Sequence, residues 1–290
     1  SLLVMIKCAY FGLLVATHGM SFRAAAVTAP RKPSALHIPR TLMQTDKTNR
    51  SEQLLRARWK EANPGFDYTF LDDGSALAFL GSLGAEYALA FQKLLPGAMK
   101  SDLLRLAWLY KHGGFYADVD KLPSSLASFT GAADIVLTMA EPDNNTDFTC
   151  QGLVYNAFMA AVPGARFVKS ALDAALGRVR SSFHMRGQDL LKTCYAIAGP
   201  LLLGEKLCQG LPRGAHPRCA FHAGEVRGPG CRAEVRRKLA LRSGETVFIL
   251  VENRARPTRN MGLLGHYSDE CRRDRIYNDS VRVTRKRAKK

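Results

Sequence analysis

The segment from Ser101 to Asp120 restricts the fold more strongly than any other part of this chain. Apolar side chains recur at helical spacing from Ser101 to His112, and the Gly113-Gly114 pair ends the predicted helix. The apolar run that follows predicts a strand over Phe115–Asp120. A helix that leads at once into an apolar strand is typical of a layered α/β domain.

The rest of the chain alternates in the same way. Strands are expected at Leu36–Met43, Tyr68–Leu71, Ile135–Met139 and Val247–Val251, and helices at Glu52–Glu61, Ala76–Leu95 and Val168–Val179. We therefore expect an α/β fold with a Rossmann-like mixed sheet flanked by helices, in a single domain. The segment from Gly204 to Arg237 is rich in Cys, Gly and Arg, and we interpret it as an excursion held by disulfides.

The charge of the chain points to anionic partners. The 290 residues carry a formal net charge of +17, and six of the last nine residues, Arg282–Lys290, are basic. At 47% hydrophobic residues the composition is that of a globular protein and excludes a disordered chain. A basic surface favours nucleic acid, acidic membranes or phosphorylated small molecules, and composition does not choose among them.

The amino-terminal residues resemble a secretory targeting segment. Lys7 precedes the apolar run Cys8–Ala16, and small residues follow at Ala24–Ala26, which is the order found in a signal peptide. The run is shorter than the roughly 20 residues of a membrane-spanning helix. Cleavage of a signal and retention as a signal anchor both remain open.

Cysteines and glycosylation motifs agree with a secretory compartment. Outside the apolar run the cysteines are Cys150, Cys194, Cys208, Cys219, Cys231 and Cys271. An even number permits up to three disulfides in an oxidising lumen, and buried thiols are the alternative. Without a CxxC pair the sequence gives no support for a zinc site. The N-x-S/T motifs at Asn49, Asn144 and Asn278 fit a glycoprotein.

Asp118-Val119-Asp120 is the candidate metal site. If the strand extends to Asp120, the two carboxylates point to the same face and Val119 points to the other, toward the core. Two carboxylates can hold Mg²⁺ or Mn²⁺ and leave other positions for phosphate and water. A lone D-x-D more often lies on a solvated turn, but here it follows a helix and an apolar strand.

The helix before this motif carries a second pair. Asp102 and Arg105 are separated by three residues and therefore lie on one face of the helix. Spacing alone favours an ordinary surface ion pair, which contributes little to stability.

The segment from Lys100 to Asp120 resembles the signature of glycosyltransferase family 32, which includes fungal Golgi α-1,6-mannosyltransferases and sphingolipid mannosyltransferase subunits. Further blocks fall in the family's order between Ile38 and Tyr277. They are Ile38–Thr48, Trp59 with Asn63–Tyr68 and Leu71–Asp73, Asn156–Ala161 with Pro163-Gly164, Ala198–Pro200, and His266-Tyr267. Two departures are Met43–Asp46, where the family often has His-Gln-x-Trp, and Ala198, where it usually has Thr.

The resemblance implies a GT-A-like domain and a role for each matching residue. Asp120 would bind the metal directly, and Asp118 would contact the ribose and metal-bound water. Asp102 and Arg105 would hold the hydroxyls of the donor sugar, which reverses the interpretation from spacing. His266 would lie near the metal or the diphosphate. Gly199 and Pro200 would shape a loop beside the donor.

We therefore predict a metal-dependent, retaining glycosyltransferase that uses Mn²⁺ or Mg²⁺ and a nucleotide sugar. The family favours mannose from GDP-mannose, with a UDP-sugar as the alternative donor and a glycan or glycolipid as the acceptor. We expect no nucleic-acid partner, and a location in the lumen of the secretory pathway, in the Golgi. The expected boundaries are 1–34 for the targeting segment and linker, 35–281 for the catalytic domain and 282–290 for a basic tail.

Three rival interpretations remain. A haloacid-dehalogenase-type phosphatase also uses a D-x-D motif, but it requires Thr or Val where this chain has Leu122. A non-catalytic, basic glycan-binding protein would not need two acidic residues in that arrangement. Nuclear nucleic-acid binding through the basic tail conflicts with the targeting segment and the cysteines.

Overall fold

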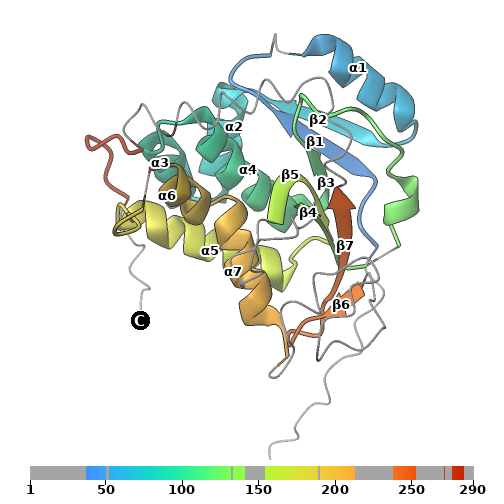
Figure 1. Cartoon of the computed structure of the whole chain (residues 1–290). Coiled ribbons are helices and arrows are strands. Elements are labelled where there is room, and N and C mark those ends of the chain that lie inside the picture. The colour runs from blue at the N-terminus through green and yellow to red at the C-terminus, as the bar shows by residue number, and fades with distance from the viewer. Residues whose placement is uncertain are drawn as a thin grey trace, which may run out of the picture. The chain divides into compact units, whose positions relative to one another are not determined.

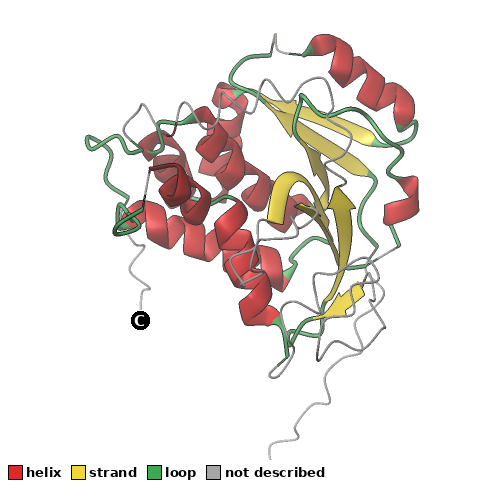
Figure 2. Ribbon diagram, in the orientation of Figure 1, coloured by secondary structure: helices red, strands yellow, loops and turns green. Residues whose placement is uncertain are grey.

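Seven strands of the described chain form one mixed sheet, which is drawn in Figures 1 and 2. The computed structural model describes residues 37–49, 52–131, 133–140, 154–188, 190–212, 238–252, 271 and 276–283. The strands are β1 (Thr41–Thr45), β2 (Asp67–Leu71), β3 (Gly114–Ala117), β4 (Ile135–Ala140), β5 (Val154–Ala161), β6 (Lys238–Ala240) and β7 (Thr246–Glu252). Their order in the sheet is β2-β1-β3-β5-β4-β7-β6.

Five of these strands run in the same direction. β1 is parallel to β2 and β3, and β4 is parallel to β7, whereas β5 is antiparallel to both β3 and β4 and β6 is antiparallel to β7. The carboxyl ends of β1, β2, β3, β4 and β7 therefore share one edge of the sheet, and β5 begins at that edge. The mixed α/β sheet that the sequence predicts is confirmed.

The helices lie mainly on one side of the strands. They are α1 (Gln53–Ala62), α2 (Asp73–Leu83), α3 (Ala85–Lys93), α4 (Gly97–His112), α5 (Arg166–Arg180), α6 (Leu190–Ile197) and α7 (Pro200–Gly210), with a 3₁₀ turn η1 at Ala127–Phe129. Figure 1 shows α2 to α7 grouped together, whereas α1 lies apart from them beside β1 and β2.

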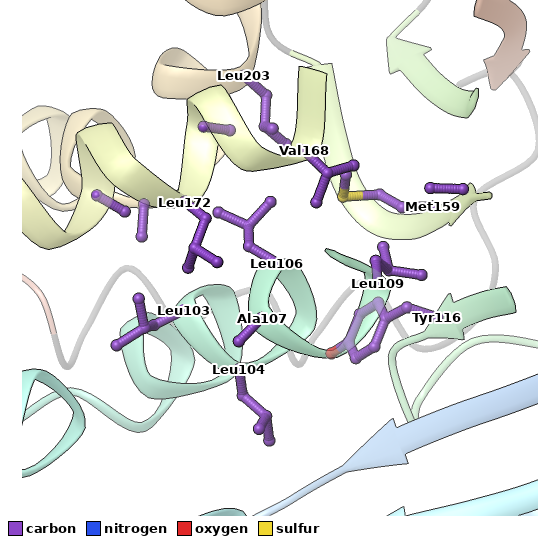
Figure 3. Packing of buried hydrophobic residues seen from close by; sticks show 14 of the residues in the cluster. Leu103, Leu104, Leu106, Ala107, Leu109, Tyr116, Met159, Val168, Leu172 and Leu203 are labelled. Atoms are coloured by element: carbon purple, nitrogen blue, oxygen red, sulfur yellow. The ribbon is translucent and has the colours of Figure 1, made fainter. Parts of the chain in front are cut away.

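Helix α4 is the centre of the core. It is buried on nearly all sides, because it packs against β1, β3 and β5 and also against α5. Figure 3 shows Leu106 pointing from α4 toward Val168 and Leu172 of α5, while Leu104 points away from them. Burying apolar side chains of this size stabilises the fold by about 1.5–3 kcal/mol each.

The Gly113-Gly114 pair connects α4 to β3 in a way that other residues cannot. Both glycines have positive φ angles, 67° and 87°. A Cβ at Gly114 would lie 1.9 Å from the Thr41 hydroxyl oxygen, and one at Gly113 would lie 2.7 Å from the Pro163 ring. The glycines therefore let α4 end directly against β1 and the loop after β5.

Several element boundaries differ from those expected. The predicted helix Ala76–Leu95 is two helices, because Gly84 has a φ of 148° and interrupts the chain between α2 and α3. The predicted first strand Leu36–Met43 is shifted to Thr41–Thr45, and the strand expected to reach Asp120 ends at Ala117. The segment Gly204–Arg237, which we expect to be an excursion held by disulfides, begins inside α7, and residues 213–237 lie outside the described residues.

A disulfide joins α6 to the carboxyl-terminal part of the chain. Cys194 and Cys271 are bonded, and both are fully buried. Three of the other predicted disulfide cysteines, Cys150, Cys219 and Cys231, lie outside the described residues. Within the described ranges, no helix is long and apolar enough to cross a membrane.

Candidate donor site

The Asp118-Val119-Asp120 motif lies on a turn at the carboxyl edge of the sheet. The amide of Asp118 still donates to the carbonyl of Ala157 in β5 at 2.8 Å, but the amide of Lys121 then donates back to the carbonyl of Asp118 at 3.1 Å and closes the turn. The prediction that a strand carries both carboxylates on one face is therefore wrong. Val119 is only half-buried instead of lying in the core.

Asp120 has an oxygen that no described residue satisfies. Its Oδ1 atom is buried and has no hydrogen-bond partner within the described residues. Burial raises the pKa of the Asp120 carboxyl, and the nearby Asp118 carboxylate raises it further, while Lys121 opposes the shift. A half-buried carboxylate without a partner is destabilising in the free protein, and a bound cation would relieve it.

Asp118 is held by two neighbours. Its Oδ1 atom accepts a hydrogen bond from the Tyr116 hydroxyl at 2.5 Å and lies 3.3 Å from Nη2 of Arg105. Burial raises the pKa of Tyr116 well above its ordinary value, so this hydroxyl keeps its proton and remains a donor. The Asp118 side chain is 32% exposed, and it is therefore accessible to a ligand while its orientation is fixed.

Asp102 and Arg105 form a buried pair, not the surface pair that their spacing suggests. Their side chains are 1% and 4% exposed, and Arg105 Nη2 lies 3.1 Å from Asp102 Oδ1. Arg105 thus bridges Asp102 on α4 and Asp118 on the turn. Its guanidinium also lies over the ring of Tyr116, 4.2 Å from the ring centre.

Asn156, at the start of β5, completes this group. Its Nδ2 atom donates to Asp102 Oδ1 at 2.6 Å, and its backbone carbonyl accepts from Nη1 of Arg105. The sequence contains Asn156 in a block that resembles the family, but no pattern there reveals this contact, because it requires β5 to lie next to β3. The contact of Tyr116 with Asp118 does have a local signal in the sequence, because Tyr116 lies only two residues before Asp118.

Gly199 approaches the same group from α7. It precedes the first residue of that helix, Pro200, and a Cβ at its position would lie 2.9 Å from Asp102 Oδ2. The structure therefore brings together Asp102, Arg105, Asp118 and Gly199, with Asp120 on the same turn. His266, the remaining residue expected at the site, lies outside the described residues.

A polar network supports the turn from β1 and β2. The buried Gln44 donates from Nε2 to the carbonyl of Asp118 at 3.2 Å and accepts from the Tyr68 hydroxyl at 2.9 Å. Arg56 of α1 donates to the same Tyr68 hydroxyl at 3.2 Å and lies over the ring of Phe70. Gln44 matches the family's His-Gln-x-Trp pattern although the residues around it do not. It supports the backbone of the Asp118-Val119-Asp120 motif.

Comparison with known proteins agrees with this geometry. Residues 49–131 match the family model described as "Glycosyltransferase sugar-binding region containing DXD motif", a range that includes Asp102, Arg105, Asp118 and Asp120. Residues 49–131 are therefore similar to a DXD-type glycosyltransferase sugar-binding region. The resemblance predicted from the sequence is thereby confirmed for this region, which holds α4, β3 and the turn.

Two individual proteins match parts of this chain. It is 36% identical over 63 residues to the initiation-specific alpha-1,6-mannosyltransferase of Saccharomyces cerevisiae, covering 21% of the chain and 13% of that protein. The chain thus spans only a small part of this relative. The PaToxG glycosyltransferase structure aligns with a TM-score of 0.41 and 17% identity, covering 60% of this chain and 69% of that one. A TM-score of this size does not establish a common fold.

The residues of the DXD turn fit a divalent cation of the hard, oxygen-binding type. Asp120 offers an unpartnered carboxylate oxygen, and Asp118 offers a second, partly exposed carboxylate. Within the described parts of the chain, no cluster of three or more His, Cys, Asp or Glu side chains surrounds them. Mg²⁺ and Mn²⁺ suit such a site, because Mg²⁺ usually binds through one or two carboxylates plus substrate phosphates and water.

Proposed function

We propose that this chain is a metal-dependent, retaining glycosyltransferase that moves a hexose from a nucleotide sugar to a glycan or glycolipid hydroxyl. The observation that carries the proposal is the unpartnered Oδ1 of Asp120 on a turn that Arg105 links to the buried Asp102. It lies at the carboxyl ends of parallel strands, where ligands bind in open α/β sheets. The match of residues 49–131 to a sugar-binding region adds support.

Asp120 and Asp118 would hold Mn²⁺ or Mg²⁺. The cation, when bound, supplies positive charge that stabilises the departing diphosphate. Asp118 is already held by Tyr116 and Arg105, which favours a contact to ribose and metal-bound water. Asp120 has a free oxygen, which favours direct coordination.

Asp102 and Arg105 would bind the hydroxyls of the donor sugar. Asp102 is held by Asn156 and Arg105 and is 1% exposed, so its carboxylate is positioned for hydrogen bonding and poorly placed to attack the anomeric carbon. This favours a front-face substitution, in which the leaving phosphate accepts the proton of the acceptor hydroxyl. Gly199 and Pro200 would border the donor. His266, which lies outside the described residues, would lie near the diphosphate, as the resemblance implies.

The donor we propose is GDP-mannose, because the yeast relative is a mannosyltransferase. UDP-sugars are the alternative. We also propose a location in the secretory-pathway lumen, in the Golgi, reached through the targeting segment in residues 1–34. The buried Cys194–Cys271 disulfide supports an oxidising compartment, and the Asn278 motif is a candidate glycosylation site there.

The test is a screen of GDP-mannose, UDP-glucose, UDP-galactose and UDP-N-acetylglucosamine for Mn²⁺-dependent hydrolysis or transfer. Asp120→Asn should lower the rate at least about a hundredfold, because a metal contributes several kcal/mol to stabilising the leaving group. Asp67→Asn is the matched control, because this exposed aspartate begins β2 at the opposite edge of the sheet. Equal activity of Asp120→Asn and the wild type would refute the metal assignment, and absence of turnover with every donor would refute the proposed reaction.

A further inference from the structure

The backbone that leaves the DXD turn is fastened to helix α1. The Trp59 indole donates from Nε1 to the carbonyl of Lys121, the residue directly after Asp120, at 3.0 Å. Trp59 is 1% exposed, and it is one of only two α1 residues that are buried, the other being Leu55. An otherwise exposed helix is thus attached to the backbone next to the proposed metal ligands.

A second α1 contact continues this attachment beyond the turn. Asn63, at the end of α1, donates from Nδ2 to the carbonyls of Trp59 and Ser124, each at 3.0 Å. Its Oδ1 atom accepts from the amide of Leu126 at 2.7 Å. Hydrogen bonds with Trp59 and Asn63 therefore hold the backbone of residues 121–126 against α1.

Asp120 lies between two fixed backbone points. On one side, Asp118 is held through its amide by Ala157 and through its carbonyl by Gln44. On the other side, the carbonyl of Lys121 is held by Trp59. The side chain of Asp120 has an Oδ1 atom with no partner in the described residues, so its direction depends on this backbone.

We propose that Trp59 is a positioning residue for the cation site: its indole N–H fixes the carbonyl of Lys121 and thereby aims the carboxylate of Asp120. This inference rests on the proposed function. In this role Trp59 contacts neither the cation nor the substrate and acts only through the backbone. Loss of the N–H removes one neutral hydrogen bond of about 1 kcal/mol, so we expect cation affinity to fall about fivefold.

The chain provides its own control in Trp108, the only other tryptophan. The Trp108 indole N–H is buried and has no hydrogen-bond partner within the described residues. Its ring packs against Phe79 and His112 near the carboxyl-terminal end of α4, the end away from Asp102. A change of Trp108 to Phe therefore removes an indole without removing a hydrogen bond to any described residue.

The experiment compares Trp59→Phe with Trp108→Phe in the full chain. Mn²⁺ is titrated with GDP or UDP present, and free Mn²⁺ is measured by electron paramagnetic resonance. We expect Trp59→Phe to bind Mn²⁺ about fivefold more weakly than Trp108→Phe, and saturating Mn²⁺ to restore its turnover. Equal dissociation constants in the two variants would overturn the inference, whereas the proposed function would stand if the wild type still bound Mn²⁺.

Fluorescence tests the same inference without requiring that Trp59→Phe fold normally. Trp108→Phe leaves Trp59 as the only tryptophan, and its emission should change when Mg²⁺ binds, because the carbonyl that its indole contacts belongs to the metal turn. An unchanged Trp59 spectrum at saturating Mg²⁺ overturns the inference. Absence of cation binding by the wild type, equal to that of Asp120→Asn, overturns the metal part of the proposed function and this inference together.

Discussion

Replacing Gly199 with Ala tests whether the buried carboxylate of Asp102 must stay where it is. The new Cβ would lie 2.9 Å from Asp102 Oδ2 and 3.3 Å from the backbone of Tyr195. Gly199 has a φ of −95°, which any residue adopts, so the substitution crowds the site without straining its own backbone. Asp102 cannot turn away freely, because Asn156 and Arg105 hold its other oxygen.

Crowding of this kind in a packed interior costs about 1–3 kcal/mol. If the displaced Asp102 is the group that binds the donor sugar, the same energy appears as a fall in kcat/KM of about 5- to 150-fold. The measurement is kcat/KM for the donor identified in the screen, together with the free energy of unfolding in urea. We expect the variant to remain folded at the assay temperature.

Gly177→Ala is the control for a glycine-to-alanine change in a helix. Gly177 lies within α5, and a Cβ there would meet no atom within 4 Å. This change should raise the free energy of unfolding by about 0.5–1 kcal/mol and leave kcat/KM unchanged. The reasoning fails if Gly199→Ala keeps the kcat/KM of the wild type, or loses no more activity than Gly177→Ala.

Two further predictions concern stability. Gly114→Ala should lower the free energy of unfolding by at least about 2 kcal/mol more than Gly65→Ala, because both have positive φ but only Gly114 would place a Cβ against Thr41; equal losses in urea titrations would exclude this steric account. Removal of the Cys194–Cys271 bond, which spans 77 residues, by a double serine variant should lower the free energy of unfolding by about 4.5 kcal/mol, measured against the oxidised wild type. A loss below about 1 kcal/mol would contradict the chain-entropy estimate.

Local patterns in the sequence predict the helices and strands around the site. The periodicity of α4 and the two glycines after it predict the end of α4 at His112, where the structure has it, and the start of β3 to within one residue. The sequence does not predict the break at Gly84, because helical periodicity continues across it and only the φ of 148° reveals the interruption. The sequence also does not predict β5 as a strand, and therefore does not predict the antiparallel pairing with β3 that brings Asn156 to Asp102.

The arrangement of the DXD turn could not be predicted from alternation. Spacing of two residues places side chains on one face only while the chain stays extended, and here the hydrogen bond from Lys121 to Asp118 ends the strand first. The contacts that fix the turn come from Gln44 and Trp59, which are 74 and 62 residues away in sequence from the carbonyls they bind. Separations of that size carry no local pattern.

The charges buried in α4 are the clearest sign that this helix serves more than stability. A buried ion pair contributes little net stability, and apolar residues of similar volume often do as well or better, whereas loss of one partner costs about 3–5 kcal/mol. The single variant Arg105→Met leaves the Asp102 carboxylate buried without its cationic partner. Its free energy of unfolding should therefore fall by about 3–5 kcal/mol. Adding Asp102→Asn removes the uncompensated charge and keeps an oxygen that can accept from Asn156, so the double variant should recover most of the lost stability. We expect neither variant to bind the donor. Urea unfolding of the two variants beside a donor-binding titration measures both quantities. If the double variant is no more stable than Arg105→Met, the buried charge of Asp102 is not the cause of the destabilisation. If the double variant still binds the donor, Asp102 and Arg105 do not hold the sugar.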